Sequence, residues 1–130
     1  MNMAGIEIQK TKTSEAQVRI QLCLERRVSS IDLSDLGLSK VPDEIKNLTY
    51  LRSIDLSENC ITELPDFIGS FTSLENLDVS YNKLSSLPEI IENLSSLEKL
   101  NARCNELASI PESIGKLTML SFLDISYNRL

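Results

Sequence analysis

Four aspartates occupy equivalent places along the chain, at intervals of 23 residues or twice that number, and a serine follows each of them two positions later. They are Asp32, Asp55, Asp78 and Asp124. Carboxylates held side by side can bind a divalent cation or share a proton in acid–base catalysis. No second catalytic group recurs with these aspartates, so we predict no catalytic residues and no metal site. Contacts between each aspartate and its serine are the simpler interpretation.

The other reactive side chains are also poorly placed for catalysis. The chain has no histidine, which excludes imidazole-dependent hydrolase sites and zinc sites with a histidine ligand. Its three cysteines, Cys23, Cys60 and Cys104, lie 37 and 44 residues apart and form no CxxC pair. An odd, scattered set is typical of reduced thiols, so we expect a cytoplasmic protein. Because a glycine-rich phosphate loop is missing too, we expect no cofactor and no enzymatic activity.

Length and charge narrow the class of protein further. The 130 residues allow one domain, and 42% hydrophobic with 25% charged residues is typical of a globular chain. Residues 1–27 carry five basic and three acidic side chains, whereas residues 28–130 carry eight basic and sixteen acidic ones. The acidic body repels nucleic-acid phosphates and anionic membranes. We therefore expect a protein partner, with no nucleic acid and no membrane.

A repeat of 23 residues, which begins at Val28 and runs without insertion to Leu130, must position these side chains. Its apolar columns include Val28, Leu51, Leu74, Leu97 and Leu120; Ile31, Ile54, Leu77, Leu100 and Leu123; and Leu33, Leu56, Val79, Ala102 and Ile125. An asparagine column follows, with Asn59, Asn82, Asn105 and Asn128, and has Leu36 in the first repeat. A proline column consists of Pro42, Pro65, Pro88 and Pro111.

Each column has a physical role. Apolar residues two apart, such as Ile54 and Leu56, point to one face of a short strand, and Asp55 between them points to the other face. The asparagine amide is expected to satisfy buried backbone groups at a bend, and proline to fix φ where the chain leaves the core. One coil alone cannot bury its apolar face, so consecutive coils must stack.

The pattern L-x-x-L-x-L-x-x-N-x-L-x-x-L-P-x-x-I-x-x-L resembles the leucine-rich repeat in its 23-residue form, over residues 28–130, as four full copies and the start of a fifth. It is similar to the intracellular Ras-suppressor, scribble and erbin type, and to repeats of Roco GTPases. The resemblance implies an α/β leucine-rich repeat solenoid, with a curved parallel sheet on the concave face and loops or short helical turns on the convex face. It also implies protein partners, without naming one.

The N-terminal segment, residues 1–27, lies outside the repeat and is expected to cap the first coil. Ser14 begins a sequence that resembles a helix capping box, so we predict a helix from about residue 14. The apolar residues between Val18 and Leu24 also fit strand alternation, which is the alternative. Ile6 and Ile8 would suit a short edge strand.

At the C-terminal end, the repeat stops halfway through a coil. Its last apolar residues would lie on an open edge beside an unpaired strand; they are Leu120, Leu123, Ile125 and Leu130. We expect either a longer protein, of which these residues are a part, or self-association through this edge.

The fourth repeat departs from its neighbours on the face opposite the core. It reads LNARCN where others read IDLSEN, LDVSYN and LDISYN, and places Arg103 among aspartates and tyrosines. Because tyrosine and arginine dominate binding hot spots, we predict a partner-binding site on the concave face. An equally good interpretation is that Arg103 only neutralises the flanking aspartates. The predicted site residues are Asp55, Asp78, Tyr81, Lys99, Asn101, Arg103, Phe122, Asp124 and Tyr127.

Two functions are consistent with these features. The first is a non-enzymatic module or scaffold that holds a protein partner on its concave face. The alternative is the regulatory leucine-rich repeat segment of a larger multidomain signalling enzyme, such as a Roco GTPase, a kinase or a ubiquitin ligase, whose catalytic part would lie beyond Leu130.

Overall fold

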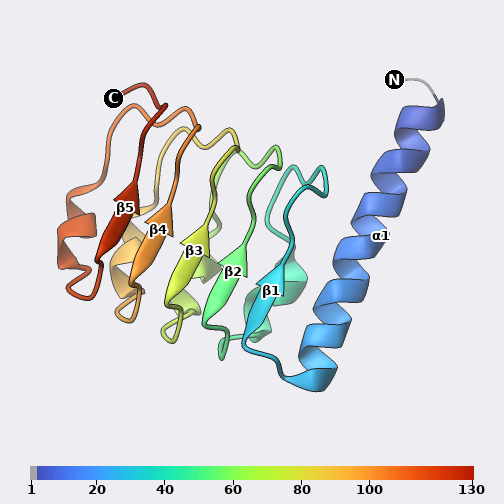
Figure 1. Cartoon of the computed structure of the whole chain (residues 1–130), viewed down its shortest axis with the longest axis horizontal. Coiled ribbons are helices and arrows are strands. Elements are labelled where there is room, and N and C mark those ends of the chain that lie inside the picture. The colour runs from blue at the N-terminus through green and yellow to red at the C-terminus, as the bar shows by residue number, and fades with distance from the viewer. Residues whose placement is uncertain (1–2) are drawn as a thin grey trace.

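The computed structural model describes the backbone of residues 3–130 and the side chains of residues 15–130. Within this range a long helix, α1 (Met3–Arg26), precedes five short strands that alternate with four 3₁₀-helices (Figure 1). The strands are β1 (Ser30–Asp32), β2 (Ser53–Asp55), β3 (Asn76–Asp78), β4 (Lys99–Asn101) and β5 (Phe122–Asp124). The 3₁₀-helices are η1 (Asp43–Asn47), η2 (Asp66–Ser70), η3 (Glu89–Asn93) and η4 (Glu112–Lys116).

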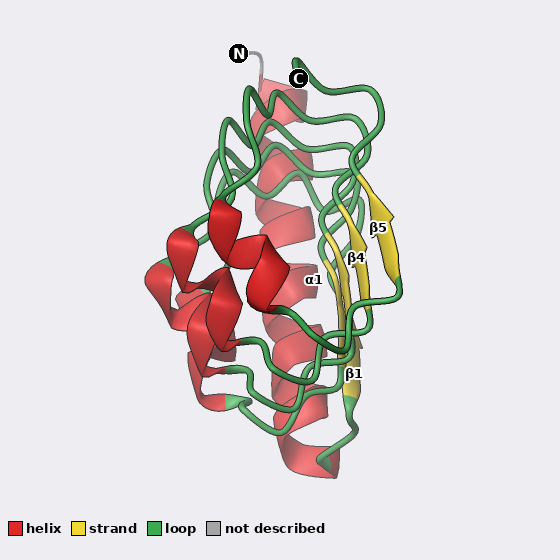
Figure 2. Ribbon diagram, turned by 90° about the vertical axis from the view of Figure 1, so that its left-hand side faces the viewer, coloured by secondary structure: helices red, strands yellow, loops and turns green. Residues whose placement is uncertain are grey.

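The strands form one parallel sheet in chain order, from β1 to β5. Its register pairs residues 23 positions apart, such as Ile31 with Ile54 and Leu77 with Leu100. The sheet lies on one side of the molecule and the 3₁₀-helices lie on the other (Figure 2). We call the sheet side, which is the side expected to be concave, the strand face, and the opposite side the turn face. The predicted solenoid with a parallel sheet and short helical turns is confirmed.

The apolar columns form a continuous core between the sheet and the turns. Leu51, Ile54 and Leu77 are at most 1% exposed. Val28, which begins the same column as Leu51, is 45% exposed, contrary to expectation. The reason is the path of the chain: Leu51 follows a 3₁₀-turn, whereas Val28 follows the end of α1 through Arg27, which has a φ of 49°.

The asparagines connect each coil to the one before it. The Asn82 amide donates to Leu56 O in the preceding coil at 2.9 Å and to Val79 O in its own coil at 3.1 Å. Its Oδ1 accepts from the N–H of Ile61, again in the preceding coil, at 3.0 Å. Asn105 makes the same three contacts one coil later. The predicted role of asparagine at a buried bend is therefore confirmed.

Because each asparagine bonds backbone groups of the preceding coil, the first repeat can have Leu36 in place of asparagine. The asparagine of one coil serves the preceding coil, and the first coil is preceded by α1 instead. Leu36 is buried, and its N–H donates to Asn59 Oδ1 at 3.0 Å. The bend keeps the shape of the others, with a φ of 52° at Asp35 and of 55° at Tyr81.

Proline precedes every 3₁₀-helix, where the chain turns back from the sheet. The four prolines Pro42, Pro65, Pro88 and Pro111 have φ angles between −60° and −71°. Each carbonyl accepts a hydrogen bond from the N–H three residues later, as between Pro65 and Ile68 at 3.0 Å. Proline thus starts the turn in a conformation that its ring already favours.

The N-terminal segment is a helix, as the capping motif indicates, but it is longer than predicted. Helix α1 begins at Met3 instead of near residue 14, so Ser14 lies inside the helix. The backbone at Ile6 and Ile8 is helical too and forms no edge strand. The side chains of these three residues lie outside the described range. The physical reason is that residues 3–13 contain no proline and one glycine, so nothing stops the helix from extending upstream.

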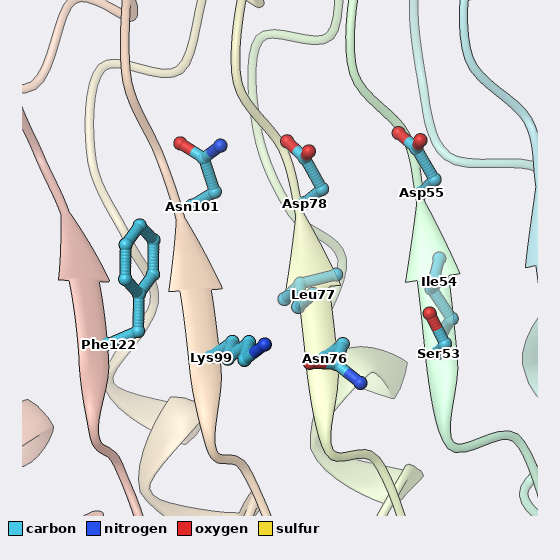
Figure 3. A pocket seen from close by; sticks show the side chains of 9 residues that line it. All are labelled: Ser53, Ile54, Asp55, Asn76, Leu77, Asp78, Lys99, Asn101 and Phe122. Carbon is cyan, nitrogen blue, oxygen red and sulfur yellow. The ribbon is translucent and has the colours of Figure 1, made fainter.

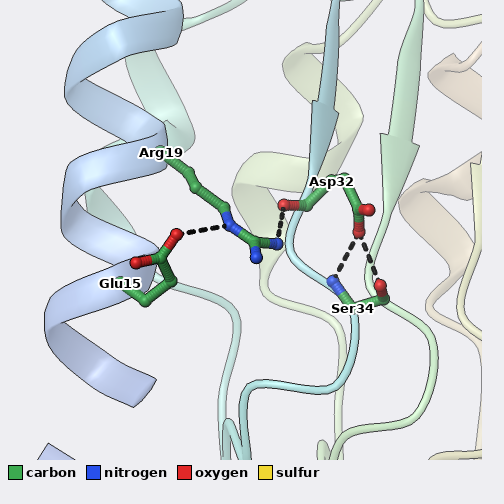
Figure 4. Close-up of polar contacts among 4 residues, drawn as sticks. All are labelled: Glu15, Arg19, Asp32 and Ser34. Atoms are coloured by element: carbon green, nitrogen blue, oxygen red, sulfur yellow. Dashed lines mark hydrogen bonds and ion pairs between the residues drawn. The ribbon is translucent and has the colours of Figure 1, made fainter. Parts of the chain in front are cut away.

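Helix α1 covers the first coil. Ala16, Ile20 and Cys23 are buried, and α1 contacts both β1 and η1. Leu24 fits the same helical spacing in the sequence but is exposed, because it lies roughly 80° around the helix from Ala16. Arg19 lies over the outer edge of β1, where its Nη1 donates to the carbonyl of Asp32 at 2.9 Å (Figure 4). A side chain thus satisfies a carbonyl that an edge strand would leave unpaired.

One buried group on the turn face departs from the repeat pattern. Ser113 takes the place that Phe67 and Ile90 hold in the two preceding repeats, and it is 4% exposed. Its hydroxyl has no hydrogen-bond partner among the described residues. A buried polar group without a partner costs about 1–3 kcal/mol. Ser113→Ala is therefore expected to raise the free energy of unfolding by about 1 kcal/mol.

Urea denaturation followed by circular dichroism measures this change, with Ser109→Ala at an exposed position of the preceding loop as the control. A loss of stability in Ser113→Ala would show that the hydroxyl makes a bond and would contradict the prediction.

Candidate functional site

The parallel register turns each outward column of the sequence into a row across the strand face. One row contains Ser53, Asn76, Lys99 and Phe122, and the next contains Asp55, Asp78, Asn101 and Asp124. Neighbouring strands of a sheet lie about 4.8 Å apart, so side chains in one row are adjacent. The strand face is therefore an array of outward side chains whose order the repeat determines.

These two rows enclose a groove of about 300 Å³ on the strand face (Figure 3). Five predicted site residues line it, namely Asp55, Asp78, Lys99, Asn101 and Phe122. The site prediction omitted Ser53 and Asn76, which line the groove as well. The sequence could have identified Ser53 and Asn76, since they stand in the same repeat column as Lys99 and Phe122.

The aspartates are held by their own serines. In Asp55 and Asp78, Oδ1 accepts the N–H of the serine two residues later at 2.9 Å and its hydroxyl at 2.6 Å. Ser57 and Ser80 are consequently buried, although strand alternation would place them on the same outward side as the aspartates. One oxygen of each carboxylate is engaged in the bend, as the simpler interpretation of the aspartate column predicts.

The same arrangement at the two ends of the row changes the acidity of the carboxyl groups. The hydrogen bond from the Ser34 hydroxyl, followed by that from the Ser34 N–H, holds the pKa of Asp32 below its usual value (Figure 4). The hydroxyl and the N–H of Ser126 lower the pKa of Asp124 in the same way. Because these bonds favour the charged form, both carboxylates remain ionised at neutral pH.

Arg103 lies in an aromatic cluster at the end of β4. Its guanidinium carbon is 4.3 Å from the centroid of the Tyr127 ring, which is a cation–π contact. Its Nη1 donates to Ser126 Oγ at 3.0 Å, and its Nε lies 3.5 Å from the Tyr81 hydroxyl. The structure thus brings together three of the predicted site residues, and we call Tyr81, Arg103 and Tyr127 the arginine cluster.

The link between Arg103 and the aspartates is indirect. Among the described residues, no ion pair joins Arg103 to a carboxylate. The Ser126 hydroxyl accepts from Arg103 and donates to Asp124 Oδ1 at 2.5 Å, so it connects the two charges. Asn101 replaces aspartate in β4 and accepts the N–H of Arg103 at 3.1 Å, which keeps the bend without a negative charge.

Metal ligands and thiols are the reactive groups to consider among the described residues. No group of three or more of their Cys, Asp and Glu side chains is arranged to hold a metal ion. The three cysteines are free, and burial raises the pKa of the Cys23 thiol, which disfavours the nucleophilic thiolate. The side chains that converge on the strand face are those of recognition: carboxylates, a lysine, an arginine and aromatic rings. No helix in the described part of the chain is long and apolar enough to cross a membrane.

Comparison with known proteins identifies the repeat. A family model described as "Leucine-rich repeat region" matches residues 23–130. A solved structure of a leucine-rich repeat protein of Leptospira interrogans is similar, with a TM-score of 0.69 and 31% identity, over 78% of this chain and 32% of that chain. The chain thus spans about a third of the length of that relative. No curated protein matches the sequence.

Proposed function

The chain belongs to the leucine-rich repeat family, and we propose that it is a non-enzymatic module that binds a protein partner on its strand face. Domains of this family are in general protein-interaction modules. The observation that carries the proposal is that the strand face holds both the groove and the arginine cluster. Together, the groove and the cluster contain eight of the nine predicted site residues. Asp124, the ninth, is connected to Arg103 through Ser126.

Arg103 is the side chain on which we expect binding to depend most. Its guanidinium is stacked on Tyr127, which is 71% exposed, so both groups are available to a partner. Arginine and tyrosine in this arrangement combine directed hydrogen bonds with a large apolar contact, which is typical of hot spots. Arg103→Glu is therefore expected to weaken partner capture at least about tenfold, because an attraction becomes a repulsion.

A pull-down with wild type, Arg103→Glu and a control variant measures this loss, and circular dichroism checks that all three are folded. Lys46→Glu is the matched control, since Lys46 is an exposed cation in η1 on the turn face. Glu92, the acidic alternative on that face, pairs with Lys116 at 3.1 Å and is less suitable. Equal recovery of the same partners by wild type and Arg103→Glu would place the contact surface elsewhere.

The edge of strand β5 is a second candidate surface, for which self-association stays a prediction. Strand β5 is the last strand of the described sheet, its residues Phe122 and Leu123 are exposed, and so is Leu130 in the same coil. An unpaired strand edge with apolar side chains favours pairing with another chain. If the protein ends at Leu130, light scattering over a concentration series is expected to show dimers or larger species. A monomer at every concentration would contradict this expectation.

The finer features of the function are proposals as well. The 23-residue repeats support a relationship to the Ras-suppressor, scribble and erbin type and a role as a signalling scaffold, and the three free cysteines support a cytoplasmic location. Because the chain spans about a third of the Leptospira relative, a place within a larger protein, such as the regulatory segment of a signalling enzyme, is the second candidate. Sequence beyond Leu130 that encodes a P-loop or a kinase signature would favour it.

A further inference from the structure

Charge is unevenly divided over the strand face. We compare three positions in each coil: the first and the last residue of the strand, and the residue two places after the strand. In the second coil these are Ser53, Asp55 and Ser57, which together carry a charge of −1. The equivalent positions of the first, third and fifth coils carry the same charge. In the fourth coil these positions are Lys99, Asn101 and Arg103, with a charge of +2. A coil with two cations thus follows three acidic coils.

From this division we propose that the partner contributes an extended segment with an acidic and a basic side chain two residues apart. The acidic side chain lies over β4, between Lys99 and Arg103, and the basic one lies over Asp55 and Asp78. This inference rests on the proposed function, namely that the strand face binds a protein, and adds the chemistry of the bound segment.

Arg103 is prepared for a carboxylate. Stacking on Tyr127 and the bond from Nη1 to Ser126 orient the guanidinium plane. Nη2 makes no hydrogen bond to the described residues, so its donors are available to a partner. A planar fork that is already oriented binds a carboxylate with directed bonds and loses little further side-chain entropy. Asn101 removes the negative charge that would otherwise repel this carboxylate.

Asp55 and Asp78 are prepared for a cation. They are register partners on β2 and β3, and their carboxylates lie side by side on the strand face (Figure 3). One oxygen of each is engaged by its serine, and neither carboxylate has an ion-pair partner among the described residues. Two like charges about 5 Å apart repel each other, and a cation between them relieves that repulsion. Since no metal-holding group is present among the described residues, the ammonium or guanidinium of a side chain fits best.

The distance between the two places sets the spacing. The distance from the midpoint between β2 and β3 to strand β4 is one and a half strand separations, or about 7 Å. Side chains on the same side of an extended chain recur every second residue, which is also about 7 Å. A segment that crosses the strands therefore presents both side chains at once when they are two residues apart. The order of the two charges depends on the direction in which the segment runs.

The test uses random peptides displayed on phage and selected against the whole chain, followed by fluorescence anisotropy with synthetic peptides. The enriched peptides are expected to share opposite charges two residues apart. Arg103→Gln and the pair Asp55→Asn/Asp78→Asn are each expected to weaken their binding about tenfold. Lys46→Gln on the turn face is the matched control and should change nothing. In Arg103→Glu, binding should return when the acidic residue of the peptide is replaced by lysine, which a mere loss of folding cannot produce.

Each other outcome is decisive. Enriched peptides without the charge pair that still depend on strand-face residues would overturn this inference and leave the proposed function standing. Peptides that bind wild type and all strand-face variants equally would overturn both. If no peptide is enriched, the strand face does not bind an extended segment, and the inference fails. The pull-down with Arg103→Glu still tests the proposed function in that case, because it also detects a folded partner.

Discussion

Leu77→Ala is expected to lower the free energy of unfolding by about 2–5 kcal/mol, the range for large-to-small changes in a core. Leu77 is 1% exposed in the central strand β3, and its register partners are Ile54 and Leu100 on either side. Because the ladder holds these neighbours in place, they cannot collapse into the space that the leucine leaves. Part of the loss is the transfer of apolar surface, and the rest is the cavity.

Chemical denaturation followed by circular dichroism measures the loss. Val18→Ala is a suitable control, because Val18 is an exposed apolar residue of α1 and its truncation should change stability by less than about 0.5 kcal/mol. Coils contact mainly their neighbours, so hydrogen exchange is expected to show the largest loss of protection in the second to fourth coils. If Leu77→Ala behaved like the control, the assignment of the core column would be wrong.

Asn82→Ala should cost roughly 2–4 kcal/mol, although it removes only a small polar side chain. The amide of Asn82 is buried and bonds Leu56 O, Val79 O and the N–H of Ile61. Alanine leaves these backbone groups without a partner in a place that water hardly reaches, and each unsatisfied group carries a desolvation penalty. The loss is therefore larger than the volume of the side chain suggests.

Asn128→Ala provides the matched comparison, since Asn128 makes the same pattern of bonds but is only partly buried. Water can replace some of its bonds, so the loss of stability should be smaller than for Asn82→Ala. Urea denaturation of the two variants in parallel measures the difference. An equal cost at both positions would contradict the explanation by burial.

Much of the candidate site could be predicted because a repeat places equivalent residues in equivalent environments. The register was implicit in the 23-residue period, and so were the adjacency of Asp55 with Asp78 and the outward direction of Lys99 and Phe122. The contacts that Arg103 makes could not be predicted in this way. Its contacts depend on the rotamers of side chains from three coils, and the period carries no information about them.

Local patterns were least reliable where the chain leaves the repeat. The start of α1 was predicted about eleven residues too late, because a capping motif shows where a helix can begin, whereas the residues before it decide whether it extends. Val28 occupies a core column by its spacing and is exposed all the same, because no 3₁₀-turn precedes it.

The 23-residue period was enough to predict the solenoid, the parallel register and most of the core, because similar coils bury their apolar columns by stacking. The stacked coils were needed to show which coil each asparagine serves, why Leu36 suffices in the first coil, and that the serines of the aspartate bends are buried. They were also needed to show that Arg103 stacks on Tyr127 rather than pairing with Asp78. These contacts join different coils, and their geometry follows from distances and side-chain orientations that exist only once the coils are stacked.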